Sequence, residues 1–302
     1  MPPIIQVKNL SKNFKEIKAV NDLSFTVPAG QVYGFLGQNG AGKSTTIRML
    51  LTLITPTSGS IEIFGMDLFH HRKEILRQTG AIIEKPDLYK YLTALENLRL
   101  FASMSGIKPT EKKLMDQLAM VGLAERAKSK IKTYSQGMKQ RLGIATALVH
   151  DPKLIILDEP TNGLDPQGIA DVRKLIIHLS RDLGKTLVIS SHMLGEMELI
   201  ADSMLIISSG KKVVEGRCED LLNPDKVQVE IQTDDKEKTI GIIRETKWGN
   251  SLIPVTNGMV LLEMKKAQIP ELNRWLTEKG VNIFSLRPKH SLEDFFLSLT
   301  KN

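Results

Sequence analysis

Residues 37–44 read Gly37-Gln38-Asn39-Gly40-Ala41-Gly42-Lys43-Ser44, which matches the phosphate-loop pattern G-x-x-x-x-G-K-[ST] without a mismatch. The apolar run 32–36 precedes this stretch, and residues 44–51 follow it with apolar side chains at helical spacing. The sequence therefore predicts a strand that turns sharply into a helix. The backbone N–H groups of such a turn, together with the positive end of the helix, form a concave site for anions.

The stretch predicts a site for a nucleoside triphosphate. Its glycines allow the backbone to approach the phosphates and to adopt positive φ. We expect Lys43 to reach the β- and γ-phosphates and the Ser44 hydroxyl to bind Mg²⁺. The plainer alternative is a glycine-rich turn before a helix, without any ligand. The strand and helix that flank the loop favour the nucleotide site over that alternative.

The composition is typical of a globular protein in a reducing compartment. The chain has 302 residues, of which 41% are hydrophobic and 25% charged, and this length predicts about two domains. Its single cysteine, Cys218, excludes an internal disulfide framework. No apolar stretch has the length needed to cross a bilayer, and the first residues lack the blocks of a signal peptide. We therefore expect the chain in the cytoplasm, with any membrane role supplied through a partner.

The net charge of +7 is compatible with nucleic acid, with anionic lipid or with solubility alone. Basic residues are scattered, with modest clusters at 70–73 and 126–132. No aromatic side chains are interleaved with them to stack on bases. We therefore expect a solvated surface of mixed charge and no nucleic acid as a partner, with anionic lipid as the alternative.

The first half of the chain alternates between strand and helix patterns. Segments 4–10 and 23–27 alternate as the strands of an antiparallel edge do, and a further strand is expected at 59–64. Helical spacing of apolar residues extends from about 93 to 148. The predicted class is α/β.

Short, fully apolar runs follow this helical region. They lie at 154–157, 187–189 and 204–207, and such runs are typical of parallel strands buried on both faces. The helical stretch 171–183 supplies the crossover between the first two.

The pattern of apolar residues changes after residues 223–224. We therefore expect a first domain over 1–222, followed by a small α/β domain over 223–302. Its predicted strands are 227–232, 259–263 and 281–286, and its predicted helix is 269–279. A short amphipathic helix, 291–299, is expected at the end, with Ser291 as its cap.

Two carboxylates end the first apolar run, where Leu157 is followed by Asp158 and Glu159. A carboxylate at the carboxyl end of a strand, beside a phosphate loop, is placed to hold Mg²⁺ through water. Asp158 is therefore the candidate metal ligand, and Glu159 is the candidate base that polarises the attacking water. The alternative is an acidic strand end that faces solvent.

Two further segments have features that suit a phosphate. His192 follows the next apolar run, where a histidine can hydrogen-bond a γ-phosphate, although a lone histidine is more often structural. Ser135 is a good N-cap for the apolar helix that follows, and Gly137 leaves backbone N–H groups accessible to an anion. Taken alone, the segment around Ser135 favours the plainer interpretation of an ordinary capped helix.

In this order the segments resemble the ATP-binding cassette (ABC) family over residues 1 to about 220. The resemblance identifies residues 37–44 as the phosphate loop and 134–138 as the signature motif. It identifies 154–159 as the second Walker motif, 162–165 as the D-loop and His192 as the switch histidine. It implies a P-loop NTPase core with an antiparallel β edge and a helical subdomain at about 85–150. It also implies nucleotide contacts from Thr45 and Asp165, and from Phe14, which would stack on adenine. The alternative for Phe14 is a buried aromatic at a strand end.

In that family two cassettes pack head to tail, and each ATP lies between the phosphate loop of one chain and Ser135 and Gly137 of the other. The resemblance therefore implies an ATPase that uses ATP and Mg²⁺ and forms a homodimer or pairs with another cassette. It implies transmembrane permease subunits as partners at the cytoplasmic face of the membrane. The competing hypothesis is a soluble ABC ATPase that acts on ribosomes or DNA. The spacing from Lys43 to Asp158 leaves room for a compact helical subdomain and argues against that hypothesis.

The chain departs from the family pattern at two places. Its signature reads Ser135-Gln136-Gly137-Met138 where the family has Ser-Gly-Gly-Gln, but the two phosphate-contacting positions, Ser135 and Gly137, are retained. Glu84 stands where a glutamine normally contacts Mg²⁺, and a carboxylate is still an oxygen ligand for that ion. The stretch 83–98 resembles cassettes of bacterial drug, bacitracin and lantibiotic-immunity exporters of the ABC-2 type. The ending 286–296 resembles the tail of drug-exporter cassettes.

Overall fold

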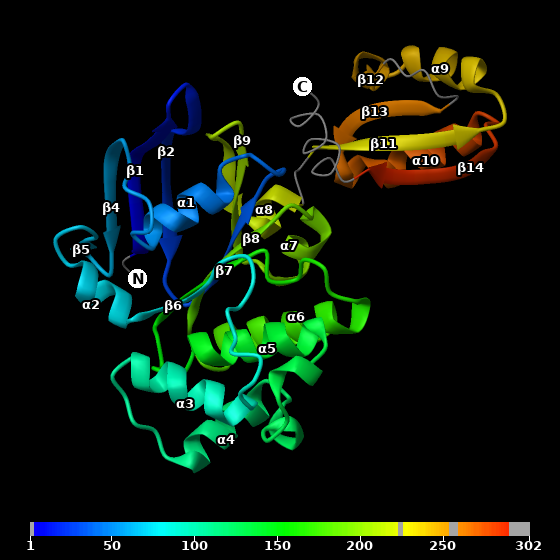
Figure 1. The fold of residues 1–302 in the computed structure, drawn as a ribbon. Coiled ribbons are helices and arrows are strands. Elements are labelled where there is room, and N and C mark those ends of the chain that lie inside the picture. The colour runs from blue at the N-terminus through cyan, green and yellow to red at the C-terminus, as the bar shows by residue number, and fades with distance from the viewer. Residues whose placement is uncertain (1–2, 223–225, 254–258, 290–302) are drawn as a thin grey trace. The chain divides into compact units, whose positions relative to one another are not determined.

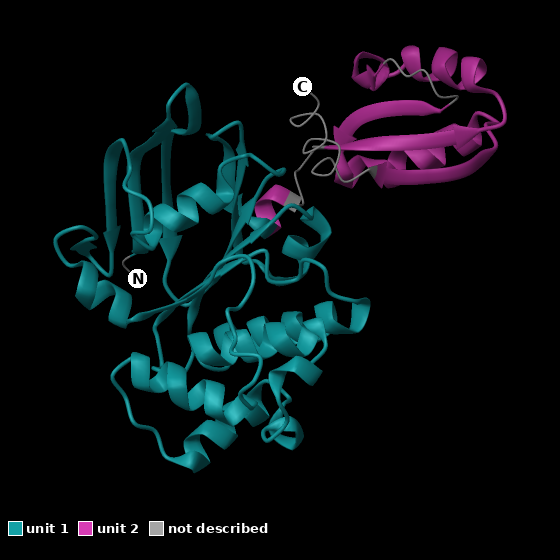
Figure 2. Ribbon diagram, in the orientation of Figure 1, with its two compact units in different colours: residues 1–218 teal, residues 219–302 magenta. Residues whose placement is uncertain are grey.

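The computed structural model describes residues 3–222, 226–253 and 259–289. The chain divides into two compact units, residues 1–218 and 219–302 (Figure 2). The final helix expected at 291–299, with its cap Ser291, lies outside the described residues.

An antiparallel sheet forms one edge of the first unit (Figure 1). Strands β1 (Pro3–Phe14) and β2 (Ile17–Pro28) pair with each other, and β4 (Ser58–Ile63) and β5 (Met66–Asp67) continue the sheet. The predicted strands are confirmed, but β1 is longer than the alternation indicates. The pairing register shifts near Asn9, which has a φ of 49°, so the hydrophobic alternation is interrupted while the strand continues.

A second sheet of six strands, in the order β10-β9-β3-β8-β7-β6, forms the centre of this unit. Strands β3, β6, β7, β8 and β9 run parallel, and β10 is antiparallel to β9. The predicted apolar runs are confirmed as strands that are almost completely buried. The strands span Val32–Leu36 (β3), Thr79–Ile82 (β6), Leu154–Asp158 (β7), Thr186–Ser191 (β8), Ser203–Ser208 (β9) and Lys211–Arg217 (β10).

Helix α1 (Lys43–Leu50) lies between the two sheets, where Ile47, Met49 and Leu50 are fully buried in one core with residues of both. The other face of the parallel sheet is covered by α6 (Pro166–Arg181), with α5 (Gln136–Ala147) packed against α6. Helix α7 (Leu194–Ile200) follows β8 and packs on β3 and β8.

The crossover helix α6 begins earlier than the predicted residue 171. The Asp165 side chain accepts a hydrogen bond of 3.1 Å from the N–H of Gly168, and Pro166 stands in the first turn. An aspartate cap followed by proline is a strong helix start, and it outweighs the polar character of the first turn.

The predicted helical region, 93–148, is confirmed as α3 (Ala94–Met104), α4 (Glu111–Met120) and α5, joined by the short 3₁₀ turns Ala124–Arg126 and Ile131–Thr133. Thr93 and Glu96 form a capping box at the start of α3, and the hydrogen bonds from Thr93 lower the pKa of Glu96. The small helix α2 (Arg72–Arg77) precedes β6.

The second unit has a sheet of its own, in the order β12-β13-β11-β14, with all pairs antiparallel. The predicted strands are confirmed as β11 (Lys226–Thr233), β13 (Val260–Lys265) and β14 (Ile283–Lys289), and the predicted helix as α10 (Ile269–Glu278). Helix α9 (Lys236–Arg244) and the two-residue β12 (Leu252–Ile253) complete a β-α-β-β-α-β order, as in ferredoxin-like domains. The division between the units falls in the short helix α8 (Cys218–Leu222).

The helices in the described parts of the chain are all too short or too polar to span a bilayer.

Candidate active site

The phosphate loop joins β3 to α1 as the sequence predicts. Gly42 is the N-cap of α1 and has a φ of 106°, and Gly40 has a φ of 83°. A Cβ atom on Gly42 would lie 2.6 Å from the carbonyl oxygen of Ala19, so this position requires glycine for space as well as for its backbone angle. The loop therefore leads directly into the N-terminus of α1, the end of a helix that favours an anion.

The Lys43 side chain folds back over this loop. Its Nζ donates hydrogen bonds to the carbonyl oxygens of Gly37 (2.6 Å) and Gln38 (3.2 Å), and lies 3.2 Å from Oε1 of Glu159. Only 5% of the side chain is exposed. The positive charge is thus held inside the curve of the loop, where phosphate oxygens would lie.

Asp158 ends β7 directly beside the loop, and its side chain is buried. Its Oδ1 accepts hydrogen bonds from the hydroxyls of Ser44 (3.2 Å) and Ser190 (2.5 Å). Its Oδ2 is buried and has no hydrogen-bond partner among the described residues. A buried carboxylate oxygen without a partner, next to a serine hydroxyl, fits the oxygen ligands that Mg²⁺ requires.

Glu159 has a φ of 50°, and each of its side-chain oxygens contacts a different candidate residue. Oε1 forms the ion pair with Lys43, and Oε2 lies 2.9 Å from Nδ1 of His192. The structure thus brings Lys43, Ser44, Asp158, Glu159 and His192 together at the carboxyl ends of β7 and β8.

Ser135 and Gly137 belong to a different part of the unit. Ser135 is exposed and caps α5 by accepting a hydrogen bond of 3.2 Å from the N–H of Met138. Gly137 lies in the first turn, where an added Cβ would meet Gly168 of α6 at 3.6 Å. Since α5 packs on α6, these residues are on the face of the parallel sheet opposite α1.

Phe14 and Glu84 also lie outside the cluster. Phe14 ends β1 with 43% of its surface exposed, so the buried alternative for this ring is wrong. Lys12 Nζ lies 5.0 Å from the centre of the ring. Glu84, with a φ of 58°, forms an ion pair with Arg48 of α1.

The sequence interpretation assigned no role to Ser190 or Arg48. Ser190 is the residue paired with Asp158 in the parallel register of β7 and β8. A serine directly after the apolar run 187–189, one strand away from a predicted catalytic carboxylate, is a signal from which its role could have been predicted. Arg48 carried no comparable signal, because its partner Glu84 is distant in the sequence.

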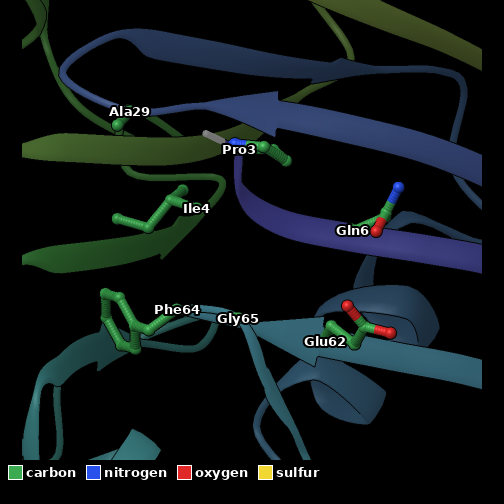
Figure 3. A pocket seen from close by; sticks show the side chains of 7 residues that line it. All are labelled: Pro3, Ile4, Gln6, Ala29, Glu62, Phe64 and Gly65. Atoms are coloured by element: carbon green, nitrogen blue, oxygen red, sulfur yellow. The ribbon is translucent and has the colours of Figure 1, made fainter. Parts of the chain in front are cut away.

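A cavity of about 520 Å³ lies away from this cluster, at the antiparallel sheet. Figure 3 shows Ile4 and Phe64 on one side and Gln6 and Glu62 on the other. None of the candidate residues lines it.

Comparison with known proteins decides the family. The sequence model of the family described as "ABC transporter" matches residues 20–162. The bacitracin transport ATP-binding protein BcrA of Bacillus licheniformis is 42% identical over 99% of this chain and 98% of its own. The chain belongs to the ABC transporter ATP-binding family. It is an ATPase with the P-loop NTPase fold, as the sequence predicts.

Other relatives of this cassette agree. The lantibiotic transport ATP-binding protein SrtF of Streptococcus pyogenes is 42% identical and covers 70% of the chain, with 90% of its own length matched. A solved dimeric cassette, MJ0796 in a post-hydrolysis state with ADP and Pi, superposes with a TM-score of 0.64 at 26% identity. That match covers 71% of this chain and 98% of the solved one. ATP is therefore the nucleotide that this cassette binds.

Proposed function

We propose that this cassette powers the export of a compound of the class that includes bacitracin and the lantibiotics, through separate permease subunits. The observation that carries the proposal is the match to a bacitracin transport ATP-binding protein over 99% of the chain, which includes the second unit. The lantibiotic relative, matched over 70% of the chain, adds support. The cassette would then lie at the cytoplasmic face of the membrane, held there by the permease.

ATP would bind between two cassettes, either two copies of this chain or this chain and a paired one. Residues 37–45 would hold the phosphates from one side, and Ser135, Gly137 and Asp165 of the other cassette would complete the site. The exposure of Ser135, on the face of the sheet opposite α1, favours a partner outside its own chain. The solved MJ0796 cassette is dimeric. Phe14, with its ring exposed at the end of β1, would stack on adenine.

Hydrolysis would use Glu159 as the base. Its carboxylate takes a proton from water as the water oxygen bonds to the γ-phosphorus, and the bond to the bridging oxygen breaks to release ADP. Lys43 remains on the β- and γ-phosphates. With a proton on each ring nitrogen, His192 would donate to Glu159 through Nδ1 and to the γ-phosphate through Nε2. Mg²⁺, when bound, neutralises charge on the β- and γ-phosphates. Ser44 would bind the ion directly and Asp158 through water, and Glu84 would reach it after leaving Arg48.

A groove beside Glu84 would receive a cytoplasmic segment of the permease. It has a volume of about 460 Å³ and an apolar lining that includes Leu51, Leu53, Ile83 and Phe101. Leu53 is 60% exposed. Because the groove also includes Lys85, next to Glu84, a docked segment would be coupled directly to the predicted metal contact.

The domain assignment completes the proposal. Residues 1–222 would form the cassette, with 85–150 as its helical subdomain, and 223–302 an accessory domain that stabilises the dimer or regulates its closure. The sheet and helices of the second unit enclose a core of their own, with Val229, Leu262 and Leu276 at its centre, which suits a separate regulatory domain.

The test is purification of the tagged, full-length chain from detergent-solubilised membranes of its native host. We expect a multispanning membrane protein to co-purify in stoichiometric amount. Leu53→Asp, which changes a residue of the groove, should abolish this co-purification. Leu183→Asp, which changes another exposed leucine away from the groove, serves as the matched control. Recovery of ribosomes or DNA without a membrane protein would overturn the proposal in favour of the soluble ATPase.

A further inference from the structure

Ser190 is a fully buried serine that contacts both carboxylate residues of the hydrolysis site. It is the last residue but one of β8, in register with Asp158 of β7. Its hydroxyl donates a hydrogen bond of 2.5 Å to Oδ1 of Asp158, and its Oγ accepts one of 2.9 Å from the backbone N–H of Glu159. The side chain of Ser190 therefore connects the side chain of Asp158 to the backbone of Glu159.

The bond to Asp158 fixes which carboxylate oxygen remains for the metal. A serine hydroxyl has a single proton to donate, and here Oδ1 of Asp158 receives it. Oδ1 also accepts the bond from Ser44, whereas Oδ2 is buried and has no hydrogen-bond partner among the described residues. Two bonds to Oδ1 hold the carboxylate plane and leave Oδ2 as the oxygen to face the ion.

The bond to Glu159 acts on the backbone. Glu159 has a φ of 50°, in the left-handed region that a residue with a side chain rarely adopts, so its backbone needs external restraint. Its N–H is held by Ser190, and its carbonyl oxygen accepts a bond of 3.1 Å from the N–H of Asn162. This conformation directs the Glu159 side chain to Lys43 and His192 instead of along the strand direction.

We propose that Ser190 is a positioning residue for ATP hydrolysis: it orients Asp158 toward the metal and holds Glu159 in the backbone conformation from which it acts as the base. The inference rests on the proposed roles of Asp158 and Glu159. Ser190 would act through its hydrogen bonds to Asp158 and Glu159. Loss of a residue that orients a metal ligand lowers metal affinity or activity about 10- to 100-fold, and that is the effect expected here.

The test compares Ser190→Ala with Ser180→Ala in the full chain. Ser180 of α6 is also buried, but its hydroxyl has no hydrogen-bond partner among the described residues, so the same change there removes no contact with Asp158 or Glu159. Each variant is measured for ATP affinity by calorimetry in EDTA, for the Mg²⁺ concentration that half-restores tight ATP binding, for phosphate release and for its unfolding temperature.

We expect Ser190→Ala to bind ATP in EDTA with wild-type affinity, because the loop and Lys43 are unchanged. Its half-saturating Mg²⁺ concentration should rise about tenfold, and its rate of phosphate release should fall about 10- to 100-fold. Ser180→Ala should match the wild type in all of these. A wild-type Mg²⁺ requirement in Ser190→Ala would overturn the inference, even if the unfolding temperature fell. Failure of the wild type to release phosphate would instead contradict the proposed function.

Discussion

Nζ of Lys43 lies 3.2 Å from Oε1 of Glu159, and the two side chains are only 5% and 16% exposed. The other oxygen of Glu159 contacts His192 at 2.9 Å. The candidate base, Glu159, is therefore held by Lys43, the residue that the γ-phosphate is expected to attract. When phosphate oxygens bind Nζ of Lys43, Oε1 of Glu159 becomes available for the attacking water. The charge of Lys43 therefore links ATP binding to the activation of the base.

Lys43→Met should weaken ATP binding by about 10- to 100-fold. A hydrogen bond to a charged group contributes about 1.5–3 kcal/mol, and each 1.4 kcal/mol is a factor of ten in affinity. The substitution also leaves Glu159 without its buried counter-charge, which is unfavourable in the folded state. Calorimetric titration with ATP checks the affinity. Lys73→Met, which removes an exposed lysine of α2, is the control, and wild-type affinity in Lys43→Met would refute the assignment.

Arg48→Ala should lower the Mg²⁺ concentration required for tight ATP binding by up to about fivefold. Arg48 pairs with Glu84 in the structure, so it competes with the metal for that carboxylate. An exposed ion pair contributes at most about 1 kcal/mol, which corresponds to a factor of about five.

The control for this prediction is Arg77→Ala, which removes an exposed arginine of α2. Glu84→Ala should have the opposite effect to Arg48→Ala. An unchanged Mg²⁺ requirement in both Arg48→Ala and Glu84→Ala would show that Glu84 is not a metal contact.

Cys218 should react slowly with thiol reagents in the folded protein. Burial, and then the charges of Asp202 and Glu198, raise the pKa of its thiol to about 12. Only the thiolate is nucleophilic, so a raised pKa suppresses labelling at neutral pH and the rate should still rise with pH above 8. We expect labelling at pH 8 to be at least about a hundredfold slower than in urea. As the chain has one cysteine, rapid labelling without urea would show that the start of α8 opens readily.

Much of the fold could be predicted because its signals are local. The phosphate loop, the apolar runs of the parallel strands and the alternation in β1 and β2 each lie within one short stretch. The N-cap Asp165 and the Pro166 that follows it were equally visible, but the polar first turn lacks apolar spacing, so the predicted helix began too late. Helix α9 was missed because its apolar residues, such as Ile243, face a core formed by distant strands.

The residues that cluster around Glu159 could be named from the sequence, but their contacts could not. A motif indicates that Lys43 and Glu159 belong to one site, yet their ion pair depends on the left-handed backbone of Glu159. The link from Ser190 to Asp158 depends on strand order and register, and these are set by the whole sheet. The pairing of Arg48 with Glu84 joins α1 to the loop after β6, so no short window of sequence contains it.

Glu159 is proposed as the base that hydrolyses the ATP held by the phosphate loop of its own chain, in a cassette that pairs with a second one. The most direct test of this role is Glu159→Gln, measured in parallel for phosphate release and for mass by light scattering with ATP and Mg²⁺. Glutamine retains the shape of the side chain but cannot take the proton. We predict ATP binding without turnover and accumulation of a dimer that persists while ATP is present. Phosphate release at the wild-type rate, with no ATP-dependent dimer, would contradict the account.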